Sequence, residues 1–170
     1  MTYAGNIKNL EDIEAEANYQ FFKGDILDKD MMGKIFLKED IDYIVNFAAE
    51  SHVDRSINDS SKFIKTNVEG THNLLELALE FDIKKYVQIS TDEVYGSLDD
   101  RGFFRETDIL NPTNPYAASK AAADMIVNSF YKTYDLSVNI CRSSNNFGPH
   151  QHPEKLIPLC IINAINSRQL

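Results

Sequence analysis

Residues 90–96, Ser-Thr-Asp-Glu-Val-Tyr-Gly, decide the fold, because they join an apolar run to a cluster of polar groups. The run before them, 86–89 (Tyr-Val-Gln-Ile), has the composition of a buried strand. The polar cluster therefore lies where a strand ends, which is where an open parallel sheet binds its ligands. Asp92 and Glu93 are candidates for an acid and a base there, since neighbouring carboxylates in a partly dry site can have unequal pKa values. An adjacent Asp and Glu can also simply begin a solvated loop.

A second pair of residues, Tyr116 and Lys120, points to the same kind of site. The two are four residues apart at the start of a helical pattern, and this spacing places them on one helix face. A nearby ammonium favours the phenolate, so we expect Lys120 to lower the pKa of Tyr116 and make it a usable base. The spacing alone is weak evidence, because Tyr19 and Lys23 share it within a segment of strand composition.

Strand and helix patterns alternate along the chain, which predicts a parallel, doubly wound α/β sheet of the Rossmann type. Asp28 is a candidate N-cap for the first clear helix. The segment 42–49 is apolar enough to suggest a strand buried on both faces. We expect strands at 19–23, 42–49, 85–90 and 137–142, helices at 29–38, 61–81, 116–134 and 154–166, and long loops at 98–115 and 143–153.

Composition excludes some classes of function. The chain has 170 residues, is 43% hydrophobic and carries a net charge of -9, which argues against a nucleic-acid binder but allows a nucleotide ligand. Cys141 and Cys160 have no metal-ligand spacing and are expected to be reduced thiols. The longest apolar stretch, 156–165, is broken by Pro158 and Asn163 and is shorter than the about 20 residues that span a bilayer. We expect a cytoplasmic protein without a membrane partner.

Taken together, the motifs resemble the dTDP-glucose 4,6-dehydratases of the extended short-chain dehydrogenase/reductase superfamily. The resemblance runs along essentially the whole chain. The related sugar-nucleotide epimerases usually lack the Asp-Glu pair after the Thr, which favours the dehydratase. The segments that carry the resemblance are AAESHVDRSI (48–57), TNVEGT (66–71), STDEVYG (90–96), PYAASKA (115–121) and SNNFGPHQHPEKLIP (144–158).

The resemblance implies a lyase that acts on dTDP-glucose with tightly held NAD+. It implies that Tyr116 takes the C4 hydroxyl proton while Lys120 holds the phenolate and the nicotinamide ribose. Thr91 then hydrogen-bonds the C4 oxygen. Glu93 removes the C5 proton and Asp92 protonates the departing C6 hydroxyl, so Asp92 has to be protonated near neutral pH.

Further contacts carry over by matched position. Ala48 and Ala49 can equally be small residues in close packing, and Thr66 can be a helix-surface residue. His150 and His152 show no metal-ligand pattern, and no metal is expected. The positions matching cofactor contacts are Thr2, Asp25, Ile26, Ala48, Ala49, Glu50, Ser51, Thr66, Tyr116, Lys120 and Asn146. The positions matching substrate contacts are Ser51, Thr91, Asn145, Lys155 and Leu156.

None of the seven glycines has the spacing of a dinucleotide-binding loop. In the family resembled, that loop precedes the Thr2 position, and a smaller sugar-binding domain follows the Leu170 position. We therefore expect residues 1–170 to be one partial NAD-binding domain that lacks the first two strands. Its sheet should have a bare edge, be destabilised or pair with another chain. A homodimer through helices 61–81 and 116–134 is expected.

Two other interpretations stay open at this point. A chain without the glycine loop can be a non-catalytic remnant that keeps site residues but does not hold NAD. A sister enzyme, either an epimerase or a dehydratase acting on another nucleotide sugar, shares most of the motifs.

Overall fold

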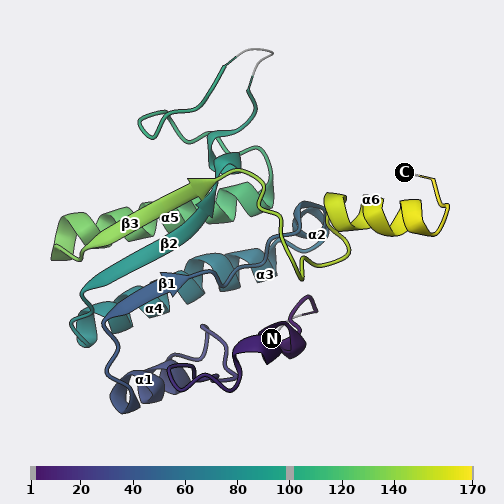
Figure 1. Cartoon of the computed structure of the whole chain (residues 1–170). Coiled ribbons are helices and arrows are strands. Elements are labelled where there is room, and N and C mark those ends of the chain that lie inside the picture. Colours follow the sequence, from purple (N-terminus) through teal and green to yellow (C-terminus); the bar gives the residue numbers. More distant parts are fainter. Residues whose placement is uncertain (1–2, 99–101, 170) are drawn as a thin grey trace. The chain divides into compact units, whose positions relative to one another are not determined.

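Three parallel strands form the centre of residues 24–144. They are β1 (Tyr43–Asn46), β2 (Lys85–Thr91) and β3 (Val138–Ser143), in the order β1-β2-β3 (Figure 1). The computed structural model describes residues 3–98 and 102–169, and these form two units: residues 24–144, and residues 1–23 together with 145–170. The prediction of a parallel α/β sheet, incomplete relative to a full Rossmann fold, is confirmed.

The helices of residues 24–144 begin where the sequence supplies caps. Helix α1 (Lys29–Lys38) starts after Asp28, whose side chain accepts a 2.9 Å hydrogen bond from the backbone N of Met31, as predicted. Helix α2 (Val53–Asn58) follows the loop after β1.

The helix expected at 61–81 is present in three successive parts. They are α3 (Ser61–Phe63), a π-helical segment η2 (Ile64–Glu69) and α4 (Gly70–Glu80). Helix α5 (Pro115–Tyr134) begins with Pro115 directly after Asn114, an arrangement that suits the first helical turn.

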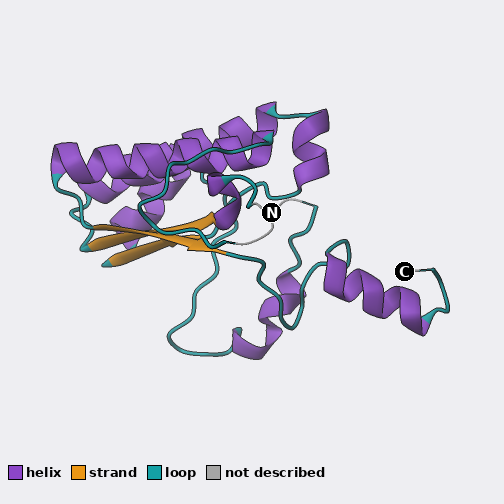
Figure 2. Ribbon diagram, turned by 90° about the horizontal axis from the view of Figure 1, so that it is seen from above, coloured by secondary structure: helices purple, strands orange, loops and turns teal. Residues whose placement is uncertain are grey.

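The core lies on one face of the sheet. Figure 2 shows helices along one side of the strands, and α4 and α5 supply most of the apolar side chains that cover it. Each strand sends alternate residues toward these helices. The buried cluster consists of Ile44, Leu74, Leu75, Ala78, Ile83, Tyr86, Val127, Phe130 and Leu136.

The expectation that segment 42–49 is buried on both faces is wrong. Ile44 and Asn46 are buried, whereas Tyr43, Val45 and Phe47 are 63%, 52% and 73% exposed. The alternation arises because α4 and α5 cover only the face toward which Ile44 and Asn46 point. Apolar composition in this strand therefore does not establish burial on each side.

Residues 19–23 are not a strand, which corrects a second expectation. Among the described residues β1 pairs only with β2, and no strand lies beyond it. A β-segment without a neighbour leaves its backbone donors and acceptors unpaired, so strand composition alone does not produce a strand.

The other unit contains a 3₁₀ helix, η1 (Ile7–Ile13), and α6 (Leu156–Ile165). Its two chain segments are joined by Tyr3, whose hydroxyl donates a 2.6 Å hydrogen bond to Glu154 Oε1. The Tyr3 ring also meets the edge of the His152 ring, with centroids 5.6 Å apart. No helix within residues 3–98 and 102–169 has the length and apolarity needed to cross a membrane.

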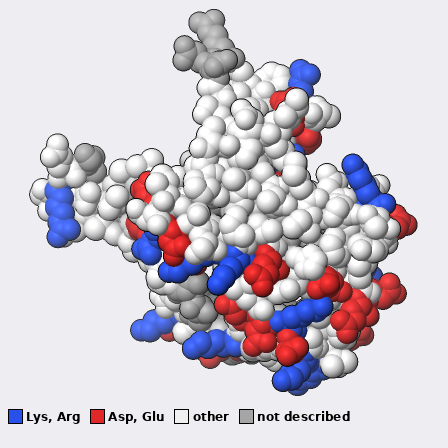
Figure 3. All heavy atoms as spheres, turned by 180° about the vertical axis from the view of Figure 1, so that it is seen from behind, with Lys and Arg blue, Asp and Glu red and all other residues white. Residues whose placement is uncertain are grey.

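Charges of both signs share the surface drawn in Figure 3. Lys and Arg side chains lie among Asp and Glu side chains on this face. A nucleic-acid binder instead gathers its basic residues into a patch or stripe.

A glycine on α4 lets the loop before α1 approach closely. A Cβ atom added to buried Gly70 would lie 2.5 Å from Ile26 Cδ1 and 2.6 Å from its Cγ1. Asn73, one turn later, donates a 3.1 Å hydrogen bond from Nδ2 to the carbonyl oxygen of Ile26. The loop that holds Asp25 and Ile26 is therefore fixed against the start of α4.

We expect Gly70→Ala to lower the free energy of unfolding, measured with urea. Overpacking costs about 1–3 kcal/mol, which exceeds the gain of about 1 kcal/mol from helix propensity. Gly33→Ala in α1 is the matched control, because its new Cβ would meet only Leu77 Cδ2 at 3.7 Å, so it should stabilise the chain. A Gly70→Ala chain that gains as much stability as Gly33→Ala would contradict the close approach of Ile26.

Candidate active site

The carboxyl end of β2 carries the Thr-Asp-Glu cluster into a 3₁₀ turn, η3 (Asp92–Tyr95). The buried Thr91 hydroxyl lies 3.3 Å from Asp92 Oδ1, to which it donates, and it accepts a 3.3 Å hydrogen bond from the backbone N of Glu93. Gly96 ends the turn with φ at 92°, a conformation that favours glycine. The turn therefore places both Asp92 and Glu93 at the edge where parallel sheets bind ligands.

Helix α5 brings Tyr116 and Lys120 to this strand end. Tyr116 is half-buried, and its phenol is close enough to Thr91 for a hydrogen bond and to the charges of Asp92 and Glu93 for electrostatic coupling. Lys120 is 3% exposed, and its Nζ donates a 2.6 Å hydrogen bond to the carbonyl oxygen of Ile89 on β2. The structure thus brings together all five residues for which the sequence suggested chemistry.

The expected lowering of the Tyr116 pKa is not found. Burial raises the pKa of Tyr116, the charges of Glu93 and Asp92 raise it further, and only the hydrogen bond with Thr91 opposes them. Lys120 is not among the groups that shift the pKa of Tyr116, and its ammonium points to the carbonyl oxygen of Ile89. Burial also lowers the pKa of Lys120, an effect that the nearby Asp124 carboxylate opposes.

A buried asparagine that the sequence reasoning missed joins the loop after β1 to α5. Asn67 is 1% exposed and lies within η2. Its Oδ1 accepts from the backbone N of Glu50 at 2.8 Å, and its Nδ2 donates to the Glu50 carbonyl oxygen at 2.9 Å and to Ser119 Oγ at 2.8 Å. Ser119 in turn donates to the carbonyl oxygen of Tyr116 at 2.7 Å. The segment TNVEGT drew attention to this region, but nothing in it distinguished Asn67.

A second group that the sequence reasoning missed ties α5 to the turn after Glu93. Arg142 on β3 donates from Nε to Asp124 Oδ2 at 2.8 Å and from Nη1 to the Tyr95 hydroxyl at 2.8 Å. The guanidinium also lies 5.1 Å from the centroid of the Tyr95 ring. Asp124 is 1% exposed and follows Lys120 by one helical turn, and that spacing was the available signal.

The residues expected to contact the cofactor divide between the two units. Ala48, Ala49, Glu50 and Ser51 form the loop after β1, and Thr66 is half-buried in η2. Ala48 is exposed rather than closely packed, and its backbone N donates to Asn46 Oδ1 at 3.1 Å. Three of its four side chains are small, and hydrogen bonds from Asn46 and Asn67 hold its backbone, as suits close approach of part of a dinucleotide. Asp25 and Ile26 precede α1, Thr2 lies outside the described residues, and Asn146 belongs to the unit of residues 1–23 and 145–170.

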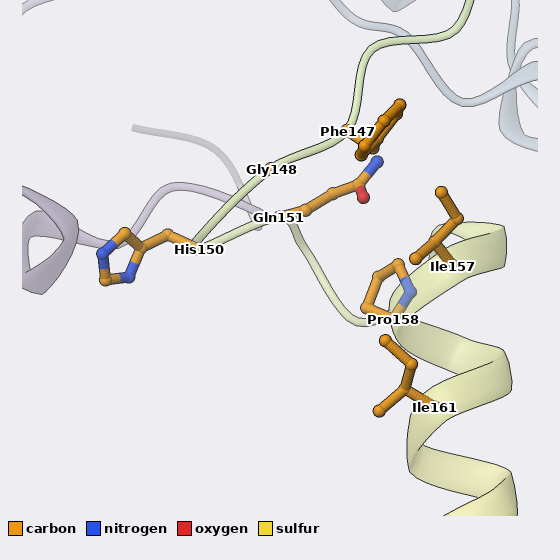
Figure 4. A pocket seen from close by; sticks show the side chains of 7 residues that line it. All are labelled: Phe147, Gly148, His150, Gln151, Ile157, Pro158 and Ile161. Atoms are coloured by element: carbon orange, nitrogen blue, oxygen red, sulfur yellow. The ribbon is translucent and has the colours of Figure 1, made fainter.

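The expected substrate contacts Asn145, Lys155 and Leu156 also belong to that unit. The unit has an apolar hollow of about 320 Å³ that none of these three residues lines. In Figure 4 the side chains of Phe147, Gln151 and Ile157 point into the hollow, while the ring of His150 points away. The hollow is lined by Phe147, Gly148, His150, Gln151, Ile157, Pro158 and Ile161.

Residues 1–170 match the family described as GDP-mannose 4,6 dehydratase. The chain belongs to this family. Among its relatives is "Low-salt glycan biosynthesis protein Agl12" from Haloferax volcanii, 52% identical over 170 residues, which cover 100% of this chain and 54% of the relative. Another is a probable dTDP-glucose 4,6-dehydratase from Sinorhizobium fredii, 45% identical over 179 residues, with 100% and 51% covered.

A solved structure is also similar. The crystal structure of DesIV, a dTDP-glucose 4,6-dehydratase from Streptomyces venezuelae with NAD and TYD bound, has a TM-score of 0.95 and 47% identity. The match covers 100% of this chain and 52% of DesIV. The chain thus spans about half the length of these members of the 4,6-dehydratase family. The resemblance expected from the motifs is confirmed.

We expect Arg142→Met to destabilise the chain, because it removes the partner of a buried carboxylate at a cost of about 3–5 kcal/mol near neutral pH. Burial already raises the pKa of Asp124, and Arg142 opposes that rise. An acid whose pKa is raised by folding contributes stability below its unfolded pKa and loses it as the pH rises through the folded pKa. The deficit should therefore be larger at pH 8 than at pH 5 in urea unfolding.

Arg105→Met is the matched control for this experiment. Arg105 is exposed and lies over the Phe103 ring at 5.2 Å, so its loss should cost less than about 0.5 kcal/mol. An equal deficit for Arg142→Met at pH 5 and pH 8 would mean that Asp124 is not the group left without its partner.

Proposed function

We propose that the chain carries the catalytic groups of an NAD-dependent dTDP-glucose 4,6-dehydratase. The supporting observation is the convergence of a phenol, an ammonium and two carboxylates at one strand end. Tyr116 on α5 is coupled to Thr91, Asp92 and Glu93, which all lie at the end of β2. An epimerase needs proton and hydride transfer at C4, whereas a 4,6-dehydratase also needs an acid and a base for the loss of water.

The proposed reaction begins at C4 of the sugar. Tyr116, once its phenol has lost its own proton, accepts the C4 hydroxyl proton, and the Thr91 hydroxyl holds the C4 oxygen in place. The resulting ketone makes the C5 proton acidic, and Glu93 removes it. Asp92 protonates the C6 hydroxyl, which leaves as water and leaves a C5–C6 double bond. Return of hydrogen to C6 and of a proton from Glu93 to C5 then makes C6 a methyl group. The products are dTDP-4-dehydro-6-deoxyglucose and one water, and the sugar undergoes no net oxidation.

NAD, when bound, supplies the acceptor for the hydrogen removed at C4 and the donor for the hydrogen returned at C6. The residues proposed to hold it are Lys120, the loop 48–51 and Thr66, with Asp25 and Ile26 on the adenosine side. Asn67 fixes the backbone of that loop through Glu50. The NAD bound in DesIV supports this choice of cofactor.

The substrate contacts, the location and the assembly remain proposals. Ser51, Asn145, Lys155 and Leu156 are proposed to contact the nucleotide sugar. A cytoplasmic homodimer through helices 61–81 and 116–134 is consistent with the exposed side chains of Met125, Tyr131 and Tyr134 on α5, which are 65%, 51% and 57% exposed. Large apolar groups on one helix suit a helix–helix interface.

Incubation of the chain with NAD+ and dTDP-glucose tests the proposed function. We expect mass spectrometry to show a 4-keto product that has lost one water. A folded chain that binds NAD+ and leaves dTDP-glucose unchanged would contradict the proposal. A folded chain that fails to bind NAD+ would instead support the non-catalytic remnant.

In an active chain, Asp92→Asn and Glu93→Gln should separate the two half-reactions. We expect elimination to slow by about 10²–10⁴-fold, the usual contribution of general acid–base catalysis, while the 4-keto sugar that retains its C6 hydroxyl accumulates. Tyr116→Phe should slow the formation of both 4-keto sugars, the one that retains its C6 hydroxyl and the one that has lost water. Glu106→Gln, which removes an exposed carboxylate from the loop before α5, is the control and should leave both rates unchanged.

A further inference from the structure

We propose that Asn114 is a positioning residue that orients the Glu93 carboxylate relative to α5. One planar amide makes both contacts. Its Oδ1 accepts a 2.8 Å hydrogen bond from the backbone N of Ala117, and its Nδ2 donates a 3.2 Å hydrogen bond to Glu93 Oε2. The N-cap of the helix that carries Tyr116 is thus also a partner of the proposed base.

The chemistry of the two contacts fixes which way the amide points. The backbone N of Ala117 is a donor and needs an oxygen, whereas an ionised Glu93 offers only acceptors and needs an N–H. Rotation of the amide by 180° would place donor against donor and oxygen against carboxylate. Asn114 is half-buried at this position. The cap therefore holds Nδ2 toward Glu93 and restricts the side-chain conformations open to the carboxylate.

The two carboxylates are held by different elements. Asp92 is bonded through Oδ1 to the hydroxyl of Thr91, its own neighbour on the strand. Glu93 is bonded through Oε2 to α5 by Asn114. Because Tyr116 and Asn114 share the first turns of α5, Asn114 sets the Glu93 carboxylate relative to the phenol. This places the proposed C5 base and C4 base in a fixed relation, and the catalytic consequence rests on the proposed function.

The local charge favours the same arrangement. Helix α5 has 20 residues, and its N-terminus carries partial positive charge from unpaired N–H groups. A carboxylate beside the N-cap is stabilised by this charge. Other helix N-caps satisfy the backbone as well as asparagine does, but an aspartate cannot donate, and the single hydroxyl oxygen of Ser or Thr would have to serve both contacts, whereas asparagine has a separate acceptor and donor.

The contact can be tested in the chain without ligands. We expect the Asn114 side-chain amide resonances in a ¹H–¹⁵N spectrum to shift in Glu93→Gln and to stay in place in Asp92→Asn, the matched control. Asn114→Ser keeps an N-cap oxygen and should melt within a few degrees of the parent chain, whereas Asn114→Ala should melt lower because the cap is lost. Asn114 resonances that do not respond to Glu93→Gln would overturn the proposal, whether or not the chain is active.

The positioning role is tested by the separation of the two half-reactions with NAD+ and dTDP-glucose. For Asn114→Ser we expect elimination to slow by about tenfold or more, the effect of losing a hydrogen bond to a charged group, with formation of the C4 ketone and the KM unchanged. Thr113→Ser, one residue earlier and outside both contacts, is the control.

The outcomes distinguish this proposal from the proposed function. An active chain in which Asn114→Ser eliminates water at the parent rate would overturn the positioning role and leave the dehydratase function standing. A chain that performs no dehydration would remove the proposed function, and the orientation of Glu93 by Asn114 would then be decided by the amide spectrum alone.

Discussion

A buried ammonium joins the sheet to α5, and the rest of the candidate site depends on this contact. Lys120 is 3% exposed, and its Nζ donates to the carbonyl oxygen of Ile89, one residue before the polar end of β2. Burying an ammonium is costly unless it is hydrogen-bonded and compensated by opposite charge. Asp124, one turn further along α5, supplies that charge. Tyr116, one turn earlier, is placed beside Thr91 by the same docking of helix on strand.

The face of the sheet that α4 covers contains a second buried polar network. In this one, the side chains of Asn46, Tyr86 and Gln88 are hydrogen-bonded to one another. The two N–H groups of Asn46 Nδ2 are shared among three acceptors, Thr71 Oγ1, Tyr86 OH and Gln88 Oε1, at 3.3, 3.1 and 3.1 Å, and Tyr86 OH donates to Gln88 Oε1 at 2.8 Å. Burial raises the pKa of Tyr86, which stays a phenol and a donor. Asn46 Oδ1 then fixes the backbone of Ala48, so the network extends from the core to the loop proposed for the cofactor. Buried polar groups with complete partners specify one arrangement of the elements around them.

Much of this fold was predictable because its signals are local. Asp28 caps α1 and the apolar periodicity of 61–81 gives a helix, since both depend on neighbours within a turn or two. Segments 19–23 and 42–49 were misjudged because strand formation and burial depend on partners distant in sequence. The Tyr116 and Lys120 pair was found from spacing, but the direction of the Tyr116 pKa was not, since it depends on which group the ammonium contacts in three dimensions.

The residues that sequence reasoning missed have one property in common: each connects two elements rather than serving one. The polar groups of the candidate site come from two elements. The phenol and the ammonium belong to α5, and the two carboxylates belong to η3. A helix and a strand end can slide relative to each other by more than catalysis tolerates unless side chains bridge them. Three bridges are present, namely Asn114 to Glu93, Arg142 between Asp124 and Tyr95, and Lys120 to Ile89. Asn114 caps α5, and Lys120 and Asp124 are polar residues among its mostly apolar buried positions. The buried polar residues of α5 are therefore best understood as contacts that hold the phenol and the ammonium in a fixed position relative to the two carboxylates.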